Sequence, residues 1–214
     1  MMRTRALFLF LLAALPALLP AAEDRFSFSA DRTEAVLSQG KERTVLSGRA
    51  EVTTGGTRIN ADRIELYGKD FRFVLCSGAV TVLDEEQGFI LNCRDLFFDR
   101  ETELARVQGY SEMLDQKQNM VVKGSFLENR GKENITVVQI GVRILREDDE
   151  GTMVCRAEYA RYDRDAEQLE LSGTPRITWK GDDYAATRIS VNLDTDEIVL
   201  EGKVSGTVTP EEEE

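Results

Sequence analysis

The side chains that could carry out chemistry in this chain are carboxylates and thiols, because its 214 residues include no histidine. Without imidazole, the sequence excludes Ser-His-Asp and Cys-His catalytic groups and any His-ligated zinc or haem. Two of the 39 acidic residues could still converge as a glycosidase pair, but no spacing singles out such a pair. We assign no catalytic residue and expect a protein that is not an enzyme. A carbohydrate-active enzyme on a β-solenoid is the weakest interpretation.

The three cysteines, Cys76, Cys93 and Cys155, lack the spacing of a zinc or haem site. Their number is odd, so at least one must be a free thiol or pair with another chain. We predict that all three are small buried hydrophobic residues. A Cys76–Cys93 disulfide remains the alternative, because an exported chain can form disulfides.

The acidic segments 84–86 and 147–150 could gather oxygen ligands for calcium, but neither contains the Asp-x-Asp-x-Asp-Gly pattern of a calcium loop. We predict that both are solvated hairpin ends, since turns favour Asp and Gly. No metal and no cofactor is therefore expected. The 27 basic residues leave a net charge of −12, which argues against nucleic acid as a partner.

Residues 1–22 have the features of a secretory signal peptide. Arg3 and Arg5 precede an uncharged run over residues 6–22, which ends in two alanines. The run is 17 residues long and contains two prolines, so an uncleaved membrane anchor, the alternative, would be short. We expect cleavage and an exported mature protein.

A repeat of about 31 residues organises the rest of the chain, which we divide into one domain over residues 23–210 and an acidic tail over residues 211–214. In the first recurring unit, an apolar alternation continues on both sides of a glycine. In the second, a small residue is followed three and five positions later by apolar or aromatic residues. The glycines are Gly48, Gly78, Gly109, Gly141, Gly173 and Gly202, and the small residues are Ala30, Ala61, Cys93, Gly124, Ala157 and Ala186.

Both units have the chemistry of a strand, because apolar and polar residues alternate with a period of two. Turn signals recur every 13 to 18 residues, as at 67–70 and 180–183, and predict about twelve antiparallel strands. In the second unit the apolar positions make an odd step, which a bulge or corner produces. The prediction is an all-β fold, a curved two-layer β-roll with negligible helix.

The inward face of this roll carries ten apolar residues that could form a packed core or line a groove for a lipid. Periodicity alone cannot separate these two roles. We take the ten as the candidate lipid-binding groove. They are Leu46, Val52, Ile59, Val80, Val82, Phe89, Phe98, Met113, Ile177 and Trp179.

The repeated units resemble the OstA-like repeat of the LptA family over residues 26–208. The matching segments are VLSGRAEV, LCSGAVTV, LELSGTP and VLEGKVSG, each with a central glycine, and the small-residue segment INADRIELYG. The resemblance implies an open, twisted β-jellyroll whose interior groove shields the acyl chains of lipopolysaccharide. It also implies that domains stack edge to edge into a bridge across the periplasm, between LptC-like inner-membrane and LptD-like outer-membrane partners.

The leading hypothesis is therefore a periplasmic, non-enzymatic bridge protein with lipopolysaccharide or a related amphiphile as its cargo. Open edges are expected at residues 26–30 and 198–208, where they would pair with the partners or with further copies, end to end. The alternative is a structural β-roll with a packed core that binds partner proteins only.

The net charge of the chain is unfavourable for binding an anionic glycolipid. Without the two N-terminal arginines, 25 basic and 39 acidic residues remain, which gives a net charge of −14. Such a charge repels an anionic lipid at long range. Local arginines could still line one rim of a groove, and the candidates are Arg58, Arg63, Arg143 and Arg176.

Overall fold

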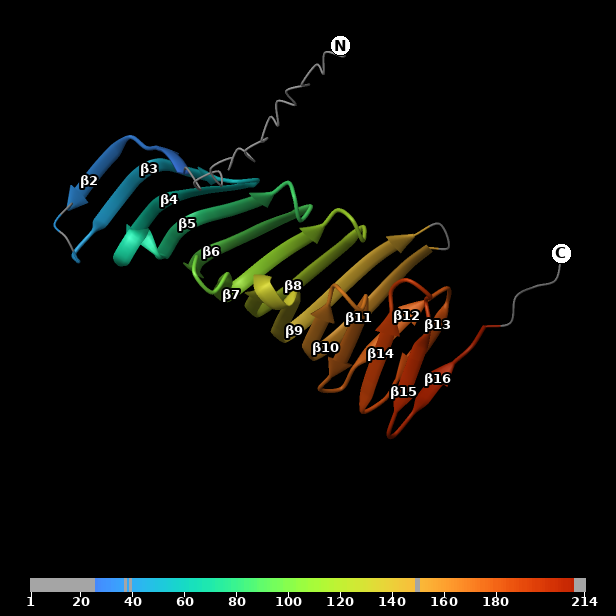
Figure 1. Cartoon of the computed structure of the whole chain (residues 1–214). Coiled ribbons are helices and arrows are strands. Elements are labelled where there is room, and N and C mark those ends of the chain that lie inside the picture. The colour runs from blue at the N-terminus through green and yellow to red at the C-terminus, as the bar shows by residue number, and fades with distance from the viewer. Residues whose placement is uncertain (1–25, 37, 39, 149–150, 210–214) are drawn as a thin grey trace, which may run out of the picture.

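The structure, a computed structural model, describes residues 26–36, 38, 40–148 and 151–209. These residues form one antiparallel sheet of sixteen strands with two short 3-10 helices, η1 (Lys69–Phe71) and η2 (Gly131–Glu133). Figure 1 shows the strands side by side along one long axis, from β2 at one end to β16 at the other. The predicted all-β fold with almost no helix is confirmed.

The predictions for the two ends of the chain concern residues that lie outside this description. They are the signal peptide over residues 1–22 and the acidic tail over residues 211–214. Among the described residues, no helix has the length and apolar character needed to cross a membrane.

Eight of the strands are long and continuous. They are β3 (Arg43–Thr54), β4 (Thr57–Tyr67), β5 (Phe73–Asp84), β6 (Phe89–Asp99), β7 (Leu104–Asp115), β8 (Met120–Arg130), β9 (Ile135–Asp148) and β10 (Gly151–Asp163). The others form four consecutive pairs: β1 (Phe26–Ser29) with β2 (Arg32–Val36), β11 (Gln168–Ser172) with β12 (Arg176–Trp179), β13 (Asp182–Ala185) with β14 (Arg188–Asn192), and β15 (Ile198–Glu201) with β16 (Ser205–Thr207). Each pair takes the place of one long strand broken in the middle. The twelve predicted strands are therefore present as twelve positions, four of which are split.

Each long strand bends in the middle, where its pairing with a neighbouring strand shifts register. In β3 the shift falls between Ser47 and Ala50, and in β5 it falls between Ser77 and Val80. The two halves of a strand therefore belong to two half-sheets that share one corner. The first half-sheet runs from β2 to β15 through β11 and β14. The second half-sheet runs from β1 to β16 through β12 and β13.

Glycines with a left-handed backbone form this corner. All six glycines of the first repeat unit have a positive φ; Gly78, for example, has φ +76° and is followed by Ala79 at +46°. Two successive left-handed residues turn a strand sharply, and glycine adopts this conformation without strain. The small-residue unit lies on the facing strand, since a Cβ atom on Gly78 would collide with Asp62, the residue after Ala61. Each repeat of about 31 residues therefore contains one glycine corner and the small-residue unit that faces it.

The corner also explains the odd step of the apolar positions. In β4, Ile59, Ala61, Ile64 and Leu66 are all buried, although three positions separate Ala61 from Ile64. In a flat strand, that step would place Ile64 on the opposite face. The bend turns it back toward the interior, and the register shift beside these residues confirms the predicted corner.

The interior is one continuous apolar cluster that extends from Leu46 in β3 to Leu193 after β14. Small side chains occupy the row at the corner, where the half-sheets converge. A Cβ atom on Gly124 of the second half-sheet would collide with Val138 of the first. On the first half-sheet, the row next to the corner also contains large side chains, including Leu46, Ile64 and Leu96.

Replacing a corner glycine by alanine should cost more where the facing strand is in contact. Gly109→Ala introduces only the strain of φ +101°, because nothing lies within 4 Å of its added Cβ atom. We expect a loss of about 1 kcal/mol in the free energy of unfolding for this variant. Gly78→Ala should lose at least twice as much, since Asp62 must also move. Urea unfolding of both variants checks this, and equal losses would show that the close approach of the strands is unimportant.

Candidate functional site

An apolar groove of about 430 Å³ lies between the half-sheets in the N-terminal part of the molecule. The second half-sheet lines one wall and the first half-sheet lines the other, with side chains from strands β3 to β8. The second contributes Val52, Ile59, Val82, Phe89, Leu91 and Met113, and the first contributes Leu66, Val74, Leu96, Phe98, Ala105 and Leu127. These residues face each other across the interior because every strand bends at the same corner.

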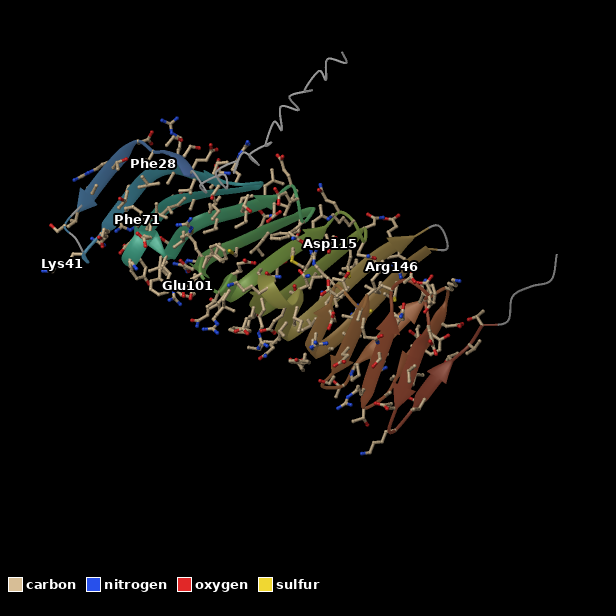
Figure 2. The ribbon with its side chains drawn as sticks, viewed as in Figure 1. Phe28, Lys41, Phe71, Glu101, Asp115 and Arg146 are labelled. Atoms are coloured by element: carbon tan, nitrogen blue, oxygen red, sulfur yellow. The ribbon has the colours of Figure 1, made fainter. Side chains whose placement is uncertain are left out.

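The mouth of the groove is formed by hairpin turns at the open ends of both half-sheets. From the second half-sheet come the turns at 55–57 and 84–87, and from the first come Phe71 of η1, Arg100 and Glu103. Figure 2 shows Phe71 and Glu101 at one end of the strands and Asp115 at the other end. The lining is thus apolar inside and polar at the rim.

At the ends of five strands, a carboxylate or amide oxygen accepts a hydrogen bond from a backbone N–H group and fixes the turn that follows. These residues are Asp84, Asp99, Asp115, Asp163 and Asn192. Asp99 also receives two hydrogen bonds from Arg72, which hold the pKa of its carboxyl far below the usual value. The segment 84–86 is therefore a hairpin end, as predicted. The segment 147–150, between β9 and β10, lies partly outside the described residues.

Toward the C-terminal part, an ion pair closes the mouth. Arg164, in the turn between β10 and β11 of the first half-sheet, approaches Asp115, at the end of β7 in the second, with 2.7 Å between Nη2 and Oδ2. The Asp115 side chain is only 1% exposed. The Nη1 atom of Arg164 also donates to the carbonyl oxygen of Gln87 at 3.3 Å. This arginine joins the two walls at the point where the groove ends.

A second ion pair closes the mouth further along the axis. Nη1 of Arg146, at the end of β9 in the second half-sheet, lies 2.6 Å from Oδ1 of Asp196, in the turn between β14 and β15 of the first. Figure 2 places Arg146 beyond Asp115 along the strand ends. Between the two walls at this level, Leu169, Leu171 and Ile189 are fully buried. The interior is therefore open in its N-terminal part and packed in its C-terminal part.

The structure separates the ten predicted groove residues into two groups. Six line the groove: Val52, Ile59, Val82, Phe89, Phe98 and Met113. Four lie outside it. Leu46, Val80 and Ile177 are buried in the cluster, and Trp179 packs against its C-terminal end.

Several groove residues were missed by the sequence prediction. The inner positions Leu66, Val74, Leu91, Leu96 and Leu127 belong to the same alternating pattern as the predicted ones. The period-two pattern could have found them. Phe71 and Arg164 lie in turns, where no periodic signal exists, so only the folded chain reveals them.

The three cysteines are free thiols in this structure, with Cys76 and Cys155 buried and Cys93 half-buried. Burial raises the pKa of Cys76 and of Cys155 to about 12, and that of Cys93 to about 11. All three are therefore protonated and unreactive near neutral pH. This fits the prediction of small buried hydrophobic residues. No Cys76–Cys93 disulfide is formed.

The arginines expected at a rim lie elsewhere. Arg63 pairs with Glu65 on the outer face of the first half-sheet, and Arg143 and Arg176 lie on the outer face of the second. Arg58 is also exposed on that outer face. The cations at the mouth are Arg100 and Arg164 instead. Within the described ranges, no group of three or more cysteine, aspartate or glutamate side chains is placed to hold a metal ion.

Comparison with known proteins assigns the chain to a family. Residues 29–197 match the family model described as LptA/(LptD N-terminal domain) LPS transport protein. None of the curated proteins compared with the chain matches it. The solved structure of LptH, described as the LptA homologous periplasmic component of the lipopolysaccharide transport device from Pseudomonas aeruginosa, is similar at 13% sequence identity with a TM-score of 0.29, over 87% of this chain and 96% of that chain. Since the family model spans well over half of the 214 residues, this chain belongs to the LptA/LptD N-terminal domain family of lipopolysaccharide transport proteins.

Proposed function

We propose that the protein is a periplasmic carrier, not an enzyme, that shields the acyl chains of lipopolysaccharide or a related glycolipid between the inner and outer membranes. The observation that carries this proposal is the apolar groove, open at its mouth, in a chain of a lipopolysaccharide transport family. Its volume of about 430 Å³ lies within the range of small-molecule binding sites. Burial of one methylene stabilises by roughly 0.8 kcal/mol, so an acyl chain of about ten methylenes would gain on the order of 8 kcal/mol before ordering costs.

A structural roll with a packed core is the second candidate, and the C-terminal part favours it locally. There the mouth ion pairs join the walls and the inner side chains are fully buried. The N-terminal part carries the groove, so the carrier function is proposed for that part of the axis.

Open strand edges at both ends support the proposed bridge. Among the described strands, β2 pairs only with β3 and β15 pairs only with β14, so each leaves one side of its backbone unpaired. Exposed apolar side chains lie at these ends, including Phe28, Val36 and Val199. Unpaired edges bind other chains by strand addition. We propose that LptC-like and LptD-like partners, or further copies of this chain, pair there.

A photo-crosslinking side chain should capture lipid only in the groove. We expect a lipopolysaccharide adduct with benzoylphenylalanine at Val82 or Met113, which line the groove, and none at Ile177, which is fully buried in the packed part. Leu75 is the matched control, because it lies on the same strand as Val82 but faces outward from the first half-sheet, where it is exposed. Mass spectrometry of the irradiated protein checks this. Adducts of equal yield at Leu75, or none at either groove position in folded variants, would refute the carrier.

Removing the arginine of the first mouth ion pair should destabilise the protein and widen the groove. Arg164→Ala leaves the Asp115 carboxylate buried without its countercharge, which we expect to cost about 3 kcal/mol in the free energy of unfolding. The double variant Arg164→Ala/Asp115→Asn removes that charge as well and should recover most of the loss. In the double variant, an apolar fluorescent dye should bind in larger amount than in the wild type. Unchanged dye binding in a folded double variant would show that the ion pair does not limit the groove.

A proline in the terminal edge strand should block end-to-end assembly. Backbone N–H groups of an edge strand alternate between its neighbour and the open side, so either Val199→Pro or Leu200→Pro removes a donor from the open side of β15. We expect one of the two to stop concentration-dependent growth in light scattering and the other to change mainly local stability. Growth that persists in both variants would place the contact elsewhere.

A further inference from the structure

Four basic side chains lie directly opposite one another on the outer face of the second half-sheet. Lys123 of β8 pairs in register with Arg143 of β9, Arg143 with Arg156 of β10, and Arg156 with Arg176 of β12. We call these four the basic row. Their inward neighbours, such as Ile144 and Cys155, are buried, so the basic row points away from the interior. With strands about 4.8 Å apart, the row spans roughly 14 Å.

The basic row has too few anionic partners of its own. Lys123 pairs with Glu112 at 2.8 Å. Arg143, Arg156 and Arg176 are exposed, and none forms an ion pair or side-chain hydrogen bond with a described residue. Like charges directly opposite each other on neighbouring strands are destabilising. The chain has a net charge of −12, yet these three adjacent arginines have no anionic partner among its described residues. An anion bound from outside would offset the repulsion between them.

An aliphatic row lies on the same outer face and runs beside the basic row in β8, β9 and β10. The strands β5 to β10 each carry an aliphatic side chain on this face, and the six residues are in register. In β8, β9 and β10, each lies two residues closer to the mouth than the basic residue of the same strand. We call this the aliphatic row, and its members are Leu83, Ile90, Leu114, Val121, Leu145 and Val154. Leu145 is 38% exposed and the others are half-buried. The face thus presents a strip of cations and a strip of aliphatic side chains that lie side by side in β8, β9 and β10, and the aliphatic strip continues over β5, β6 and β7.

This geometry favours a lipid bilayer over a peptide as the partner. In the middle of the sheet, backbone groups are already paired with strands on both sides, so a peptide cannot add as a further strand there. Strips of cations and apolar side chains on one face are the pattern by which peripheral elements bind an anionic membrane surface. We propose that the basic row and the aliphatic row dock this protein on the anionic surface of a lipid bilayer.

The acidic remainder of the chain weakens this docking only at long range. At physiological ionic strength, charges more than about 8 Å away are largely screened. Three nearby acids are already engaged: Glu112 pairs with Lys123, Glu158 accepts from the Gly141 N–H at 3.2 Å, and Asp183 accepts from the Thr178 hydroxyl at 2.7 Å. The docking does not depend on the groove or on its cargo, so it can fail or succeed independently of the proposed carrier function.

The test is co-flotation of the purified chain with vesicles. Vesicles of phosphatidylethanolamine and phosphatidylglycerol should bind the protein, and vesicles of phosphatidylcholine should not. The triple variant Arg143→Ala/Arg156→Ala/Arg176→Ala should lose binding to the anionic vesicles by on the order of 10²-fold, since each cation near an anionic surface contributes about fivefold. It should fold at least as well as the wild type, because like charges have been removed.

The matched control is Lys41→Ala/Lys69→Ala/Lys203→Ala, which removes three exposed cations away from the basic row. Figure 2 shows Lys41 at the far N-terminal end. This control should bind within about twofold of the wild type. Equal loss in both triple variants would reduce the effect to net charge and overturn the proposal. It would equally be overturned if the wild type failed to float, or if it bound soluble polyglutamate through the three arginines and ignored the vesicles.

Discussion

The constraint on which the whole structure depends is the left-handed corner in the middle of every strand. Because each strand bends at the same place in the repeat, one continuous sheet folds over itself and turns both of its apolar faces to a common interior. The backbone remains paired on either side of the bend, so apolar side chains leave water without leaving buried N–H and C=O groups unpaired. Glycines such as Gly78 supply the bend, and small residues such as Gly124 allow the half-sheets to approach.

Distance from the corner then sets the chemistry of each row. On the second half-sheet, small residues such as Ala61 and Gly124 lie next to the corner and larger apolar residues such as Ile59 and Met113 lie further out, and hydrogen-bonded carboxylates fix the turns at the mouth. The same repeat produces a groove at one end and a core at the other, and the ion pairs of Arg164 and Arg146 join the walls where the core begins and beyond it. A groove and a packed roll are therefore two parts of one axis.

The sequence predicts what is local and repeated. Spacing of glycines and small residues locates the corner, and alternation locates the inner rows, because both effects act within a single strand. The splitting of four strand positions could not be predicted, since Gly173 and Gly202 look like the glycines of continuous strands. Nor could the limit of the groove, because it is set where Asp115 at the end of β7 pairs with Arg164 in a turn far along the chain, and this pair interrupts no periodic pattern. Ile177 and Met113 thus look alike in the sequence, although only Met113 lines the groove.

The outer faces of the two half-sheets differ in how their charged side chains are paired across neighbouring strands. On the first half-sheet, opposite charges meet across strands: Arg106 faces Glu128, with 2.7 Å between Nη2 and Oε2, and Arg161 faces Glu170. That face satisfies its own charges and needs no partner. On the second half-sheet, arginines face one another, an arrangement that lowers the stability of the fold and that an external anion would offset. Since both faces belong to one sheet built from one repeat, the difference lies in the side chains that the strands carry and not in strand geometry. The second face is the one that the proposed docking would bring to an anionic surface, because an external anion there would offset the repulsion between its arginines.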